Sequence, residues 1–451
     1  MKKNLSFAYF AMVVAVSFFV IECSGGKETA FYVSPDGNDS STGTSPRTAF
    51  LTLGRALDAV AEVTASGPLV KPVTVHVGGG VYQLDAPLVI NPRHSGTAAF
   101  PVTISAKPDA PAVISGGMPV IGWKEGRNGV WTAQVEPGWL FRQLFVNGER
   151  RIRARTPNVD LFRVDGAVKR DEKASFTYRD DDIDPAWADT AAELIMLQKW
   201  AELRMHIETA DPVAKAVTLS KLSSPSNREN NARYYVENVP DALDAAGEWY
   251  LDPDSGVVSY IPLPGENPAE AEIVAPALTE LVRFEGDFDA GRWVENVTIK
   301  GLTLEYTDWS LPEDGYADVQ AAVAIPSVIT GNGCRSVAIE NCVLRHHGNY
   351  GIEFARGCHD VAVRRSEIAD MGAGGIRIGE TSSREAESDK THGAAVTDNH
   401  IHHIGEVYPA ACGVIIFRSG QNLIAHNHIH DTYYTGISNG WSWGYAETDT
   451  K

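Results

Sequence analysis

The sequence predicts an all-β chain folded as a right-handed parallel β-helix, a solenoid with an N-terminal capping helix and an inserted β-rich domain. The first observation is a repeat, because the run at residues 334–344 recurs at residues 358–368, a shift of 24 positions. Further copies lie at 297–304, 396–401 and 424–429. The second observation is that each copy alternates apolar and polar residues and leaves no room for a helix between strands. Such units bury their apolar faces only by stacking, and general chirality favours a right-handed coil.

The first segment of the chain is expected to direct export. Residues 7–21 form an apolar run behind Lys2 and Lys3 that is too short to span a bilayer, so residues 1–22 are interpreted as a signal peptide. Cys23 follows directly, which permits lipidation of this cysteine, although Glu22 is a poor match to the small residue that such processing prefers. Ordinary secretion and a lipid anchor through Cys23 both stay open. The expected location is secreted, periplasmic or anchored in the outer membrane of a bacterial envelope.

The rest of the chain divides into three parts. Residues 30–118 are expected to form the N-terminal cap and the first rungs, because Leu53, Leu57 and Val60 share one face of a helix. Residues 119–290 lose the repeat and become Trp-rich and turn-rich, which predicts the inserted β-rich domain. Residues 291–451 carry the clearest rungs. The sequence stops where a further rung is expected, so the β-helix is predicted to be incomplete at its carboxyl end.

Charge and cysteine usage restrict the partners only in part. The chain has 39 Lys and Arg against 58 Asp and Glu, and its formal charge of −19 repels polyanions at long range. Nucleic acid is therefore not an expected partner. Cys334 and Cys358 align between two repeats, and this alignment is compatible with a disulfide or with an inward-facing ladder of thiols.

One column of polar residues is the leading candidate for catalysis. His346, Asp370, His403 and Asp431 each lie two positions after an apolar strand residue in successive repeats. Because adjacent rungs are about 4.8 Å apart, Asp370 and Asp431 are expected about 9.6 Å apart with His403 between them. One aspartate then protonates a leaving oxygen while the other activates water, as in inverting glycosidases. Polar residues at a repeated bend are more often merely solvated, which is the structural alternative.

A second pattern places four histidines on two rungs. His400 and His402 align with His428 and His430, and residues i and i+2 of a strand share a face. Imidazole suits zinc, so a zinc site is conceivable. A structural or sugar-facing histidine surface is favoured, because the sequence shows no outer carboxylate partner for these rings. No metal and no other cofactor is therefore expected.

Several other side chains are candidates for substrate binding. Trp441, Trp443 and Tyr434 gather just after a strand, where an aromatic ring can stack on a sugar, although core packing is the commoner fate of tryptophan. His346 is assigned to binding through its place in the column. The alternation at residues 151–155 puts three guanidinium groups on one strand face, with Arg155 as the candidate contact. These arginines either clamp a substrate carboxylate or, more in keeping with the composition, pair with the abundant acids.

Short segments along the chain carry a family resemblance. They are FYVSPDGND at 31–39, FRQLFVNG at 141–148, RARTPN at 153–158, WYLD at 249–252, TGI at 435–437 and GWSWG at 440–444. Together they resemble the right-handed β-helix glycoside hydrolases of family 141, from about residue 30 to the last residue. The resemblance implies an exported carbohydrate-active enzyme of a glycan-degrading bacterium that acts on plant cell-wall polysaccharide. Known activities of that family include α-L-fucosidase on complex pectin and xylanase, so the resemblance implies no single substrate.

The resemblance fails at the carboxyl end. Related sequences continue into an Asp-x-Gly-Gly-Ile-Tyr segment and a later Tyr-x-Asp-Glu segment, whose aspartates are the favoured catalytic acids of that family. Neither segment occurs in this sequence. The chain is therefore interpreted as truncated. If the catalytic acids lie beyond residue 451, Asp370 and Asp431 bind substrate or are structural.

The leading functional prediction is an exported glycoside hydrolase that uses paired carboxylates on plant cell-wall or related complex polysaccharide. One alternative is a polysaccharide lyase on the same scaffold, which requires a base and a cation or arginine beside a uronate, because the fold alone does not fix the reaction. The other alternative is a non-catalytic glycan-binding surface protein. Product analysis separates the two reactions, since only a lyase creates an unsaturated end that absorbs ultraviolet light.

Overall fold

The computed structural model describes residues 28–223 and 229–441. The predicted signal peptide at residues 1–22, Cys23 and Trp443 lie outside the described residues. Almost all regular structure in the described part is strand, with one α-helix, α1 (Leu53–Ala65), near its beginning. Among the described residues, no helix combines the length and the apolar character needed to cross a bilayer.

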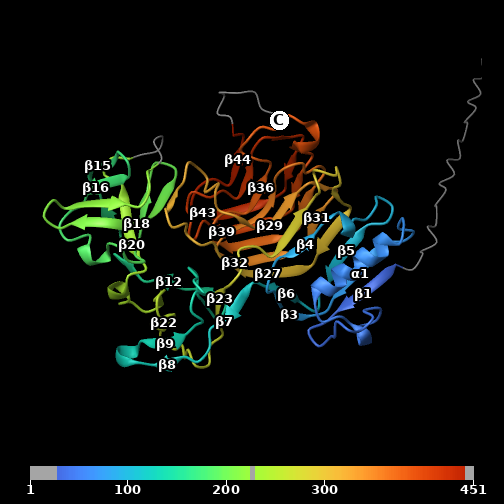
Figure 1. The fold of residues 1–451 in the computed structure, drawn as a ribbon, viewed down its shortest axis with the longest axis horizontal. Coiled ribbons are helices and arrows are strands. Elements are labelled where there is room, and N and C mark those ends of the chain that lie inside the picture. Colours follow the sequence, from blue (N-terminus) through green and yellow to red (C-terminus); the bar gives the residue numbers. More distant parts are fainter. Residues whose placement is uncertain (1–27, 224–228, 442–451) are drawn as a thin grey trace, which may run out of the picture.

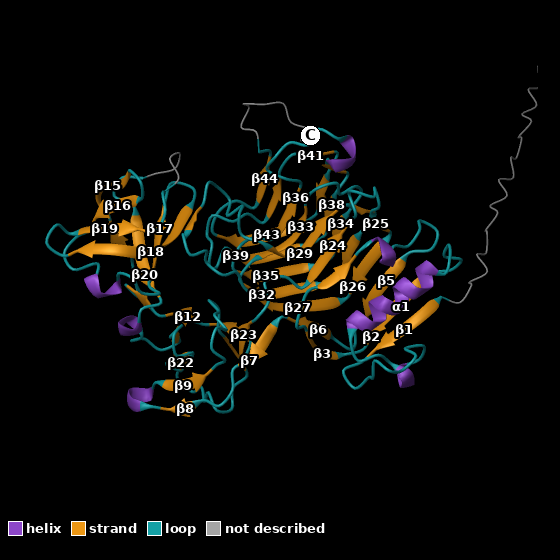
Figure 2. Cartoon of the chain, viewed as in Figure 1, coloured by secondary structure: helices purple, strands orange, loops and turns teal. Residues whose placement is uncertain are grey.

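Three parallel sheets wind around a common core and form the β-helix at the centre of Figures 1 and 2. The first sheet contains β1 (Thr29–Val33), β2 (Val73–Val77), β5 (Val102–Ala106), β26 (Val297–Lys300), β31 (Ala338–Glu340), β34 (Ala362–Arg364), β38 (Ala395–Thr397) and β42 (Leu423–Ala425). The second sheet contains β3 (Gly80–Gln83), β6 (Ala112–Ser115), β27 (Leu302–Thr307), β32 (Val343–His347), β35 (Glu367–Met371), β39 (His400–Ile404) and β43 (His428–Thr432). The third sheet contains β4 (Leu88–Ile90), β24 (Val282–Glu285), β29 (Ser327–Asn332), β33 (Tyr350–Phe354), β36 (Ile376–Ile378), β40 (Val414–Ile416) and β44 (Ile437–Asn439).

The register of these strands follows the sequence repeat and confirms the predicted fold class. Leu344, Ile368 and Ile401 pair in line on the second sheet, and all three side chains are fully buried. Their stacking fills the core with one aliphatic side chain per rung, and this burial is the main favourable term in the stability of a solenoid. Cys334 and Cys358 are free, buried thiols, so the cysteines form the inward ladder and not a disulfide.

Close contact between rungs explains two glycines in the segment between β35 and β36. A Cβ atom on Gly375 would lie 2.4 Å from the carbonyl oxygen of Gly413, and one on Gly372 would lie 2.4 Å from that of Gly348. Real Cβ atoms do not approach backbone so closely. Glycine at these positions therefore allows the polypeptide backbones of neighbouring rungs to meet.

The predicted cap is also present. Thr52 begins α1 by accepting a hydrogen bond of 3.1 Å from the backbone N–H of Arg55 through its side chain. Leu53, Leu57 and Val60 are buried in the same core as the first rungs. The helix thus covers apolar side chains that the open end of the solenoid would otherwise expose to water.

The inserted region leaves the β-helix at β7 (Gly117–Pro119) and returns with β23 (Ile273–Pro276), which pairs with β7. It contains two mainly antiparallel units with separate cores, seen at the lower left and upper left of Figure 1; in the first unit β12 and β21 pair in parallel. The first unit contains β8 (Lys124–Glu125), β9 (Trp131–Gln134), β10 (Phe145–Val146), β11 (Glu149–Arg150), β12 (Ile152–Arg153), β21 (Glu248–Leu251) and β22 (Val257–Tyr260). The second unit contains β13 (Arg155–Thr156), β14 (Phe162–Arg163), β15 (Asp165–Arg170), β16 (Ala174–Thr177), β17 (Glu193–Leu197), β18 (Glu202–Asp211), β19 (Ala216–Leu219) and β20 (Arg233–Glu237), joined by β28 (Tyr316–Ala317).

The carboxyl boundary of this insertion differs from the expected residue 290. Strand β24 at 282–285 is already part of the third sheet, where it pairs with β4 and β29. Val282 and Phe284 point into the solenoid core, whereas Arg283 pairs with Glu280 at the surface. This rung was missed because its strands are separated by the long insertion and do not show the 24-residue spacing.

Candidate active site

The predicted column lies at one corner of the second sheet. His346, Asp370, His403 and Asp431 all have left-handed backbone, with φ between 48° and 62°, and Tyr306 on the preceding rung does too. The parallel pairing skips each of these positions, so the side chains leave the sheet at a bend while the flanking residues stay in register. Non-glycine residues rarely adopt this conformation. Repeating it on successive rungs brings the column's side chains to one edge of the β-helix.

A hairpin from the inserted region reaches this edge. The strands β10 and β11 are joined by Asn147 and Gly148, with φ of 51° and 75°, which is the turn favoured by Asn-Gly. Phe145 on this hairpin packs 5.5 Å from the ring of His346 and 5.2 Å from that of Tyr306. The next strand of the hairpin ends with Arg150, so the tight turn carries a guanidinium group onto the column.

Arg150 and His346 hold the carboxylate of Asp370 from two sides. The Nε of Arg150 donates to Oδ1 of Asp370 at 3.0 Å, and Nδ1 of His346 donates to Oδ2 at 2.8 Å. Arg150 also donates to the backbone carbonyls of His347 and Asp370, at 3.0 Å and 2.9 Å, and to the side chain of Gln143. These contacts fix the orientation of Asp370, whose side chain is 25% exposed.

The same contacts keep Asp370 ionised. Burial by itself raises the pKa of a carboxyl group, but the positive charge of Arg150 and the hydrogen bond from His346 outweigh it. The pKa of Asp370 is lowered to about 2. At any pH where the protein is assayed, Asp370 therefore carries a negative charge that faces the cleft beside it.

That cleft has a volume of about 300 Å³ and lies between the inserted region and the corner of the second sheet. Asp370 and Glu406 both line it, together with six arginines. Glu406 is exposed, but partial desolvation still raises its pKa, and the negative charges of Asp370 and Asp431 add to this against the opposing charges of Arg150 and His403. Apart from Glu237, which is ion-paired with Arg153 and Arg204, the cleft thus holds two carboxyl groups whose surroundings move their pKa values in opposite directions. Such a division is typical of an acid and its partner carboxylate.

The loop that carries Glu406 is fixed to the rung before it. After β39, the backbone N–H of Glu406 donates to the carbonyl of Met371 at 3.1 Å, and those of Val407 and Tyr408 donate to the carbonyl of Gly372 at 2.9 Å and 2.7 Å. The loop therefore follows the bend of Asp370 on the neighbouring rung. These bonds bring Glu406 and Asp370 to the same cleft.

A buried network of charges forms the floor of the cleft. Arg142 pairs with Glu193 at 2.6 Å, and Arg153 pairs with Glu193 at 2.8 Å and with Glu237 at 3.2 Å. Arg204, which is 1% exposed, pairs with the same Glu237 oxygen at 3.2 Å. Because each guanidinium meets a carboxylate, the desolvation of these charges is offset by direct attraction.

Two contacts connect this network to the β-helix. Arg204 donates to the carbonyl of Val407 and lies 4.8 Å from the ring centre of Tyr408, both in the loop of Glu406. The backbone N–H of Arg142 donates to Asp308, just after β27, at 2.7 Å. The inserted region is therefore joined to the rungs next to the two carboxyl groups of the cleft.

The other predicted catalytic residues lie beside the cleft and not among the residues that line it. Asp431 is 60% exposed and accepts a hydrogen bond of 2.8 Å from Nδ1 of His430. The side chain of His403 is 59% exposed, and its Nε2 lies 3.9 Å from Asp431. Thus Asp431 and His403 meet each other as expected, while Asp370 is held by Arg150 and His346.

The predicted binding residues have different environments. Trp441 is 8% exposed and packs edge-to-face on Phe417 at 5.0 Å, so the structure corrects its assignment as an open sugar platform: it is a core residue. Tyr434 is partly exposed and accepts a hydrogen bond from Gln320 at 3.4 Å. His346 is only 15% exposed, and its Nδ1 lies 2.8 Å from Oδ2 of Asp370. Arg155 lines the cleft.

Arg150 and Glu406 are the residues that sequence reasoning missed. The Asn147-Gly148 pair was a detectable signal for the hairpin. Nothing in the repeat indicated that this hairpin would contact Asp370. Glu406 belongs to a loop between two rungs, and loops do not follow the repeat. Arg150 bonds Asp370 from the inserted region, and Glu406 lines the same cleft as Asp370.

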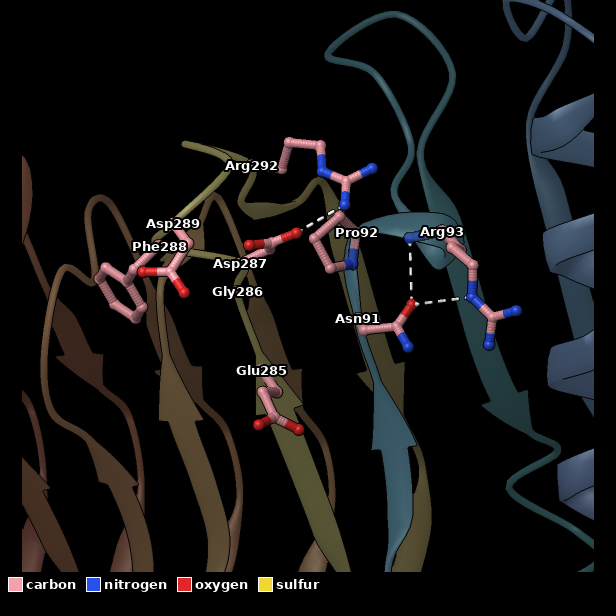
Figure 3. Close-up of a pocket in the computed structure, with 9 residues that line it drawn as sticks. All are labelled: Asn91, Pro92, Arg93, Glu285, Gly286, Asp287, Phe288, Asp289 and Arg292. Carbon is pink, nitrogen blue, oxygen red and sulfur yellow. Dashed lines mark hydrogen bonds and ion pairs between the residues drawn. The ribbon is translucent and has the colours of Figure 1, made fainter.

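A second, wider basin of about 650 Å³ lies at a corner of the third sheet, between the turns that follow β4 and β24 (Figure 3). Part of its lining is paired locally: Arg292 pairs with Asp287 at 2.5 Å, and Asn91 accepts a hydrogen bond from the backbone of Arg93 at 3.1 Å. The pairing with Arg292 lowers the pKa of Asp287. Because its ion-paired Asp287 is held in the charged form, this carboxyl group is a poor proton donor and the basin is a weaker candidate for acid–base chemistry.

Comparison with known proteins supports the fold. Residues 327–440 match a family model described as a right handed beta helix region. A solved structure titled "Glycoside hydrolase" shares 22% identity and a TM-score of 0.80, covering 93% of this chain and 81% of the other. "The complex structure of XylC with xylose" shares 15% identity and a TM-score of 0.54, covering 92% of this chain and 60% of the other. No curated protein matches the chain.

Proposed function

We propose that the protein is a glycoside hydrolase that cleaves plant cell-wall polysaccharide in the cleft between its inserted region and its second sheet. The observation that carries this proposal is the pair of carboxyl groups in one cleft, with the pKa of Asp370 lowered to about 2 and that of Glu406 raised. The solved structures titled as a glycoside hydrolase and as a xylose complex support the same class of substrate.

In this proposal the two carboxyl groups have separate roles. Glu406 donates a proton to the leaving oxygen of the glycosidic bond, which a raised pKa favours. Asp370, held negative by Arg150 and His346, faces the positive charge that develops on the sugar ring, as nucleophile or as the base that activates water. Arg150 and His346 are positioning residues, because they act through Asp370.

The lining of the cleft favours an acidic polysaccharide. The whole chain has a formal charge of −19, yet six arginines line this cleft. Arg155 stacks over the ring of Tyr235, 4.0 Å from its centre, and its Nε donates to the carbonyl of Pro157 at 3.2 Å. Within the described residues, no carboxylate forms an ion pair with Arg155. Its outer nitrogens therefore suit the carboxylate of a uronic acid unit.

Replacing Arg155 with methionine is expected to raise KM about tenfold or more for a uronate-bearing polysaccharide, because a charge-assisted hydrogen bond to the substrate is lost. The value of kcat and the KM for a neutral polysaccharide should change little. Steady-state kinetics on matched acidic and neutral substrates measure this. Arg163→Met is the control, since Arg163 is exposed and bonds only a backbone carbonyl outside the cleft. An equal loss on both substrates contradicts the assignment.

The opposed pKa values also predict a pH profile. Glu406 must be protonated to act, so kcat/KM should fall as the pH rises through its raised pKa. Asp370 must be ionised, and since its pKa is about 2 it should add no acidic limb in the usual assay range. Glu406→Gln should lower kcat/KM and abolish the alkaline limb. A Glu406→Gln enzyme that keeps the wild-type profile excludes Glu406 as the acid.

A lyase is the second candidate, and the arginines around Asp370 favour it specifically. Elimination at a uronate needs a base and a positive group that neutralises the carboxylate, and Arg150 and Arg155 line the same cleft. The reaction products test the two proposals directly. New reducing ends without ultraviolet absorption support the hydrolase, whereas unsaturated ends support the lyase. Binding without either product leaves the non-catalytic glycan-binding alternative.

We extend the proposal to export of the protein and to its membership of glycoside hydrolase family 141. Residues 1–22 would be removed as a signal peptide, and the mature protein would act in the bacterial envelope or outside the cell. Mass spectrometry of the mature N-terminus tests this. A lipid-modified Cys23 supports the anchored form, and an unmodified terminus near this position supports ordinary secretion.

A further inference from the structure

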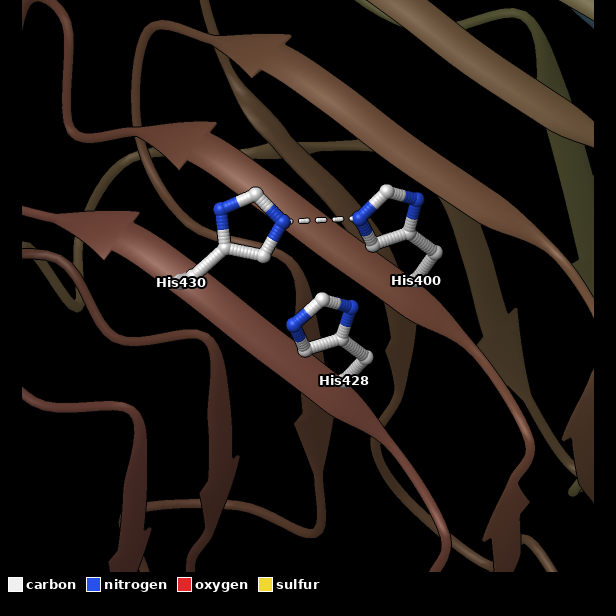
Figure 4. Close-up of side chains that lie close together, drawn as sticks. All are labelled: His400, His428 and His430. Atoms are coloured by element: carbon white, nitrogen blue, oxygen red, sulfur yellow. Dashed lines mark hydrogen bonds between the residues drawn. The ribbon is translucent and has the colours of Figure 1, made fainter.

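Four histidines cover the outer face of the last two strands of the second sheet. His400 pairs in register with His428, and His402 with His430. The rings of the first pair are 5.0 Å apart with an interplanar angle of 5°, and those of the second pair are 5.1 Å apart with an angle of 3°. Across the diagonal, the Nε2 atoms of His400 and His430 lie 2.8 Å apart, and Figure 4 shows them facing each other.

A carboxylate is hydrogen-bonded at the opposite nitrogen of one facing ring, His430, and a second carboxylate, Glu367, lies near His400 but bonds Nε2 of His402 at 3.2 Å. The Nδ1 of His430 is 2.8 Å from Oδ2 of Asp431, and the Nδ1 of His400 is 4.0 Å from Oε1 of Glu367. A carboxylate at Nδ1 favours a proton on that nitrogen, which leaves a lone pair on Nε2. This is the outer partner that the sequence did not reveal. It is the usual arrangement behind a histidine that ligates a metal.

At 2.8 Å the two Nε2 atoms are joined by a hydrogen bond, which needs a proton on one of them, and a bound cation would replace this proton and take both nitrogens as ligands. His428 adds a third donor, since His400, His428 and His430 each offer one nitrogen and these atoms all lie within 4.8 Å of one another. Imidazole nitrogen is a preferred ligand of borderline divalent metals and not of calcium or magnesium, which prefer oxygen.

We propose that His400, His428 and His430 bind a divalent transition-metal cation such as zinc. Three imidazole nitrogens hold the ion, and Asp431 orients the ring of His430 from behind. The partly exposed position on the sheet face leaves a coordination position open to water or to a ligand. The proposed metal ligands do not include Asp370 or Glu406. A failure to bind zinc can therefore be told apart from a failure of the hydrolase proposal.

The test measures zinc binding by tag-free, chelator-treated protein, using isothermal titration calorimetry and competition with a chromophoric chelator. One zinc ion per chain is expected. His400→Ala and His430→Ala should each weaken binding by more than the roughly 10–100-fold that loss of an outer carboxylate causes. Asp431→Asn should weaken zinc binding by roughly 10–100-fold. Cobalt, added in place of zinc, should give visible absorption that disappears in His430→Ala.

His426→Ala is the matched control. His426 also faces a carboxylate, with Nδ1 3.4 Å from Asp398, but lies outside the three-histidine group. Its loss should leave zinc affinity unchanged, and circular dichroism checks that each variant is folded. Absence of stoichiometric binding overturns the proposal, as does an equal effect of His426→Ala. A second group of possible ligands, Glu367, His400 and His402, is the alternative metal site that this test must distinguish. If His402→Ala abolishes binding while His428→Ala does not, the three-imidazole site is wrong.

Discussion

Replacing Asp370 with asparagine lowers kcat on the polysaccharide substrate by roughly 10²–10⁴-fold, the usual contribution of a positioned acid–base group. The amide keeps the shape of the side chain but loses its negative charge. It neither attacks nor takes a proton, and it does not stabilise the positive charge that develops on the sugar. Because binding contacts elsewhere in the cleft remain, KM should change much less than kcat.

The control for this prediction is Asp398→Asn. Asp398 also has left-handed backbone, with φ of 58°, and faces a histidine, His426, at 3.4 Å, but at a different corner of the rungs. Its replacement should leave kcat unchanged. Thermal unfolding of both variants separates a loss of chemistry from a loss of fold, since Asp370→Asn leaves Arg150 without its charged partner. A folded Asp370→Asn enzyme with wild-type kcat excludes Asp370 from the reaction.

Replacing Arg204 with alanine should reduce the free energy of unfolding by about 3–5 kcal/mol. The guanidinium is 1% exposed and pairs with Glu202 at 2.9 Å and with Glu237 at 3.2 Å. Its removal leaves Glu202 buried and without this compensating charge, and desolvation already raises the pKa of Glu202 to about 7. The midpoints of thermal and urea unfolding measure the loss.

Activity should fall together with stability in this variant, because Arg204 also donates to the carbonyl of Val407, next to Glu406. Lys221→Ala is the control, since Lys221 forms an exposed pair with Asp314 at 2.6 Å in the same inserted unit. An exposed pair contributes about 0–1 kcal/mol, so this change should have little effect on unfolding. If both variants unfold alike, the buried network does not stabilise the inserted region.

The repeat in the sequence was sufficient to predict the solenoid and much of its register. Residues such as Leu344 and Ile368 recur at a fixed spacing because each rung buries its side chain against the next. The periodicity of the sequence therefore predicts which residues form the core. The column of His346, Asp370, His403 and Asp431 followed from the same spacing. Its members do leave the sheet at one bend, which is a local property of each rung.

The repeat did not predict which residues surround Asp370. Arg150 comes from an inserted hairpin and Glu406 from a loop, and neither segment repeats, so no periodicity relates them to Asp370. Trp441 shows the opposite error, because an aromatic residue after a strand has the same sequence signature whether it faces a sugar or the core.

The sequence by itself therefore determined the stacked architecture, the capping helix and the alignment of polar residues, since these depend on contacts between neighbouring rungs. Only the tertiary structure decided which carboxyl groups share a cleft, which are ionised, and which histidines have a carboxylate behind them. These properties depend on charges and hydrogen bonds between segments far apart in the chain. The pKa of a side chain is set by such neighbours, and no repeat in the sequence encodes them.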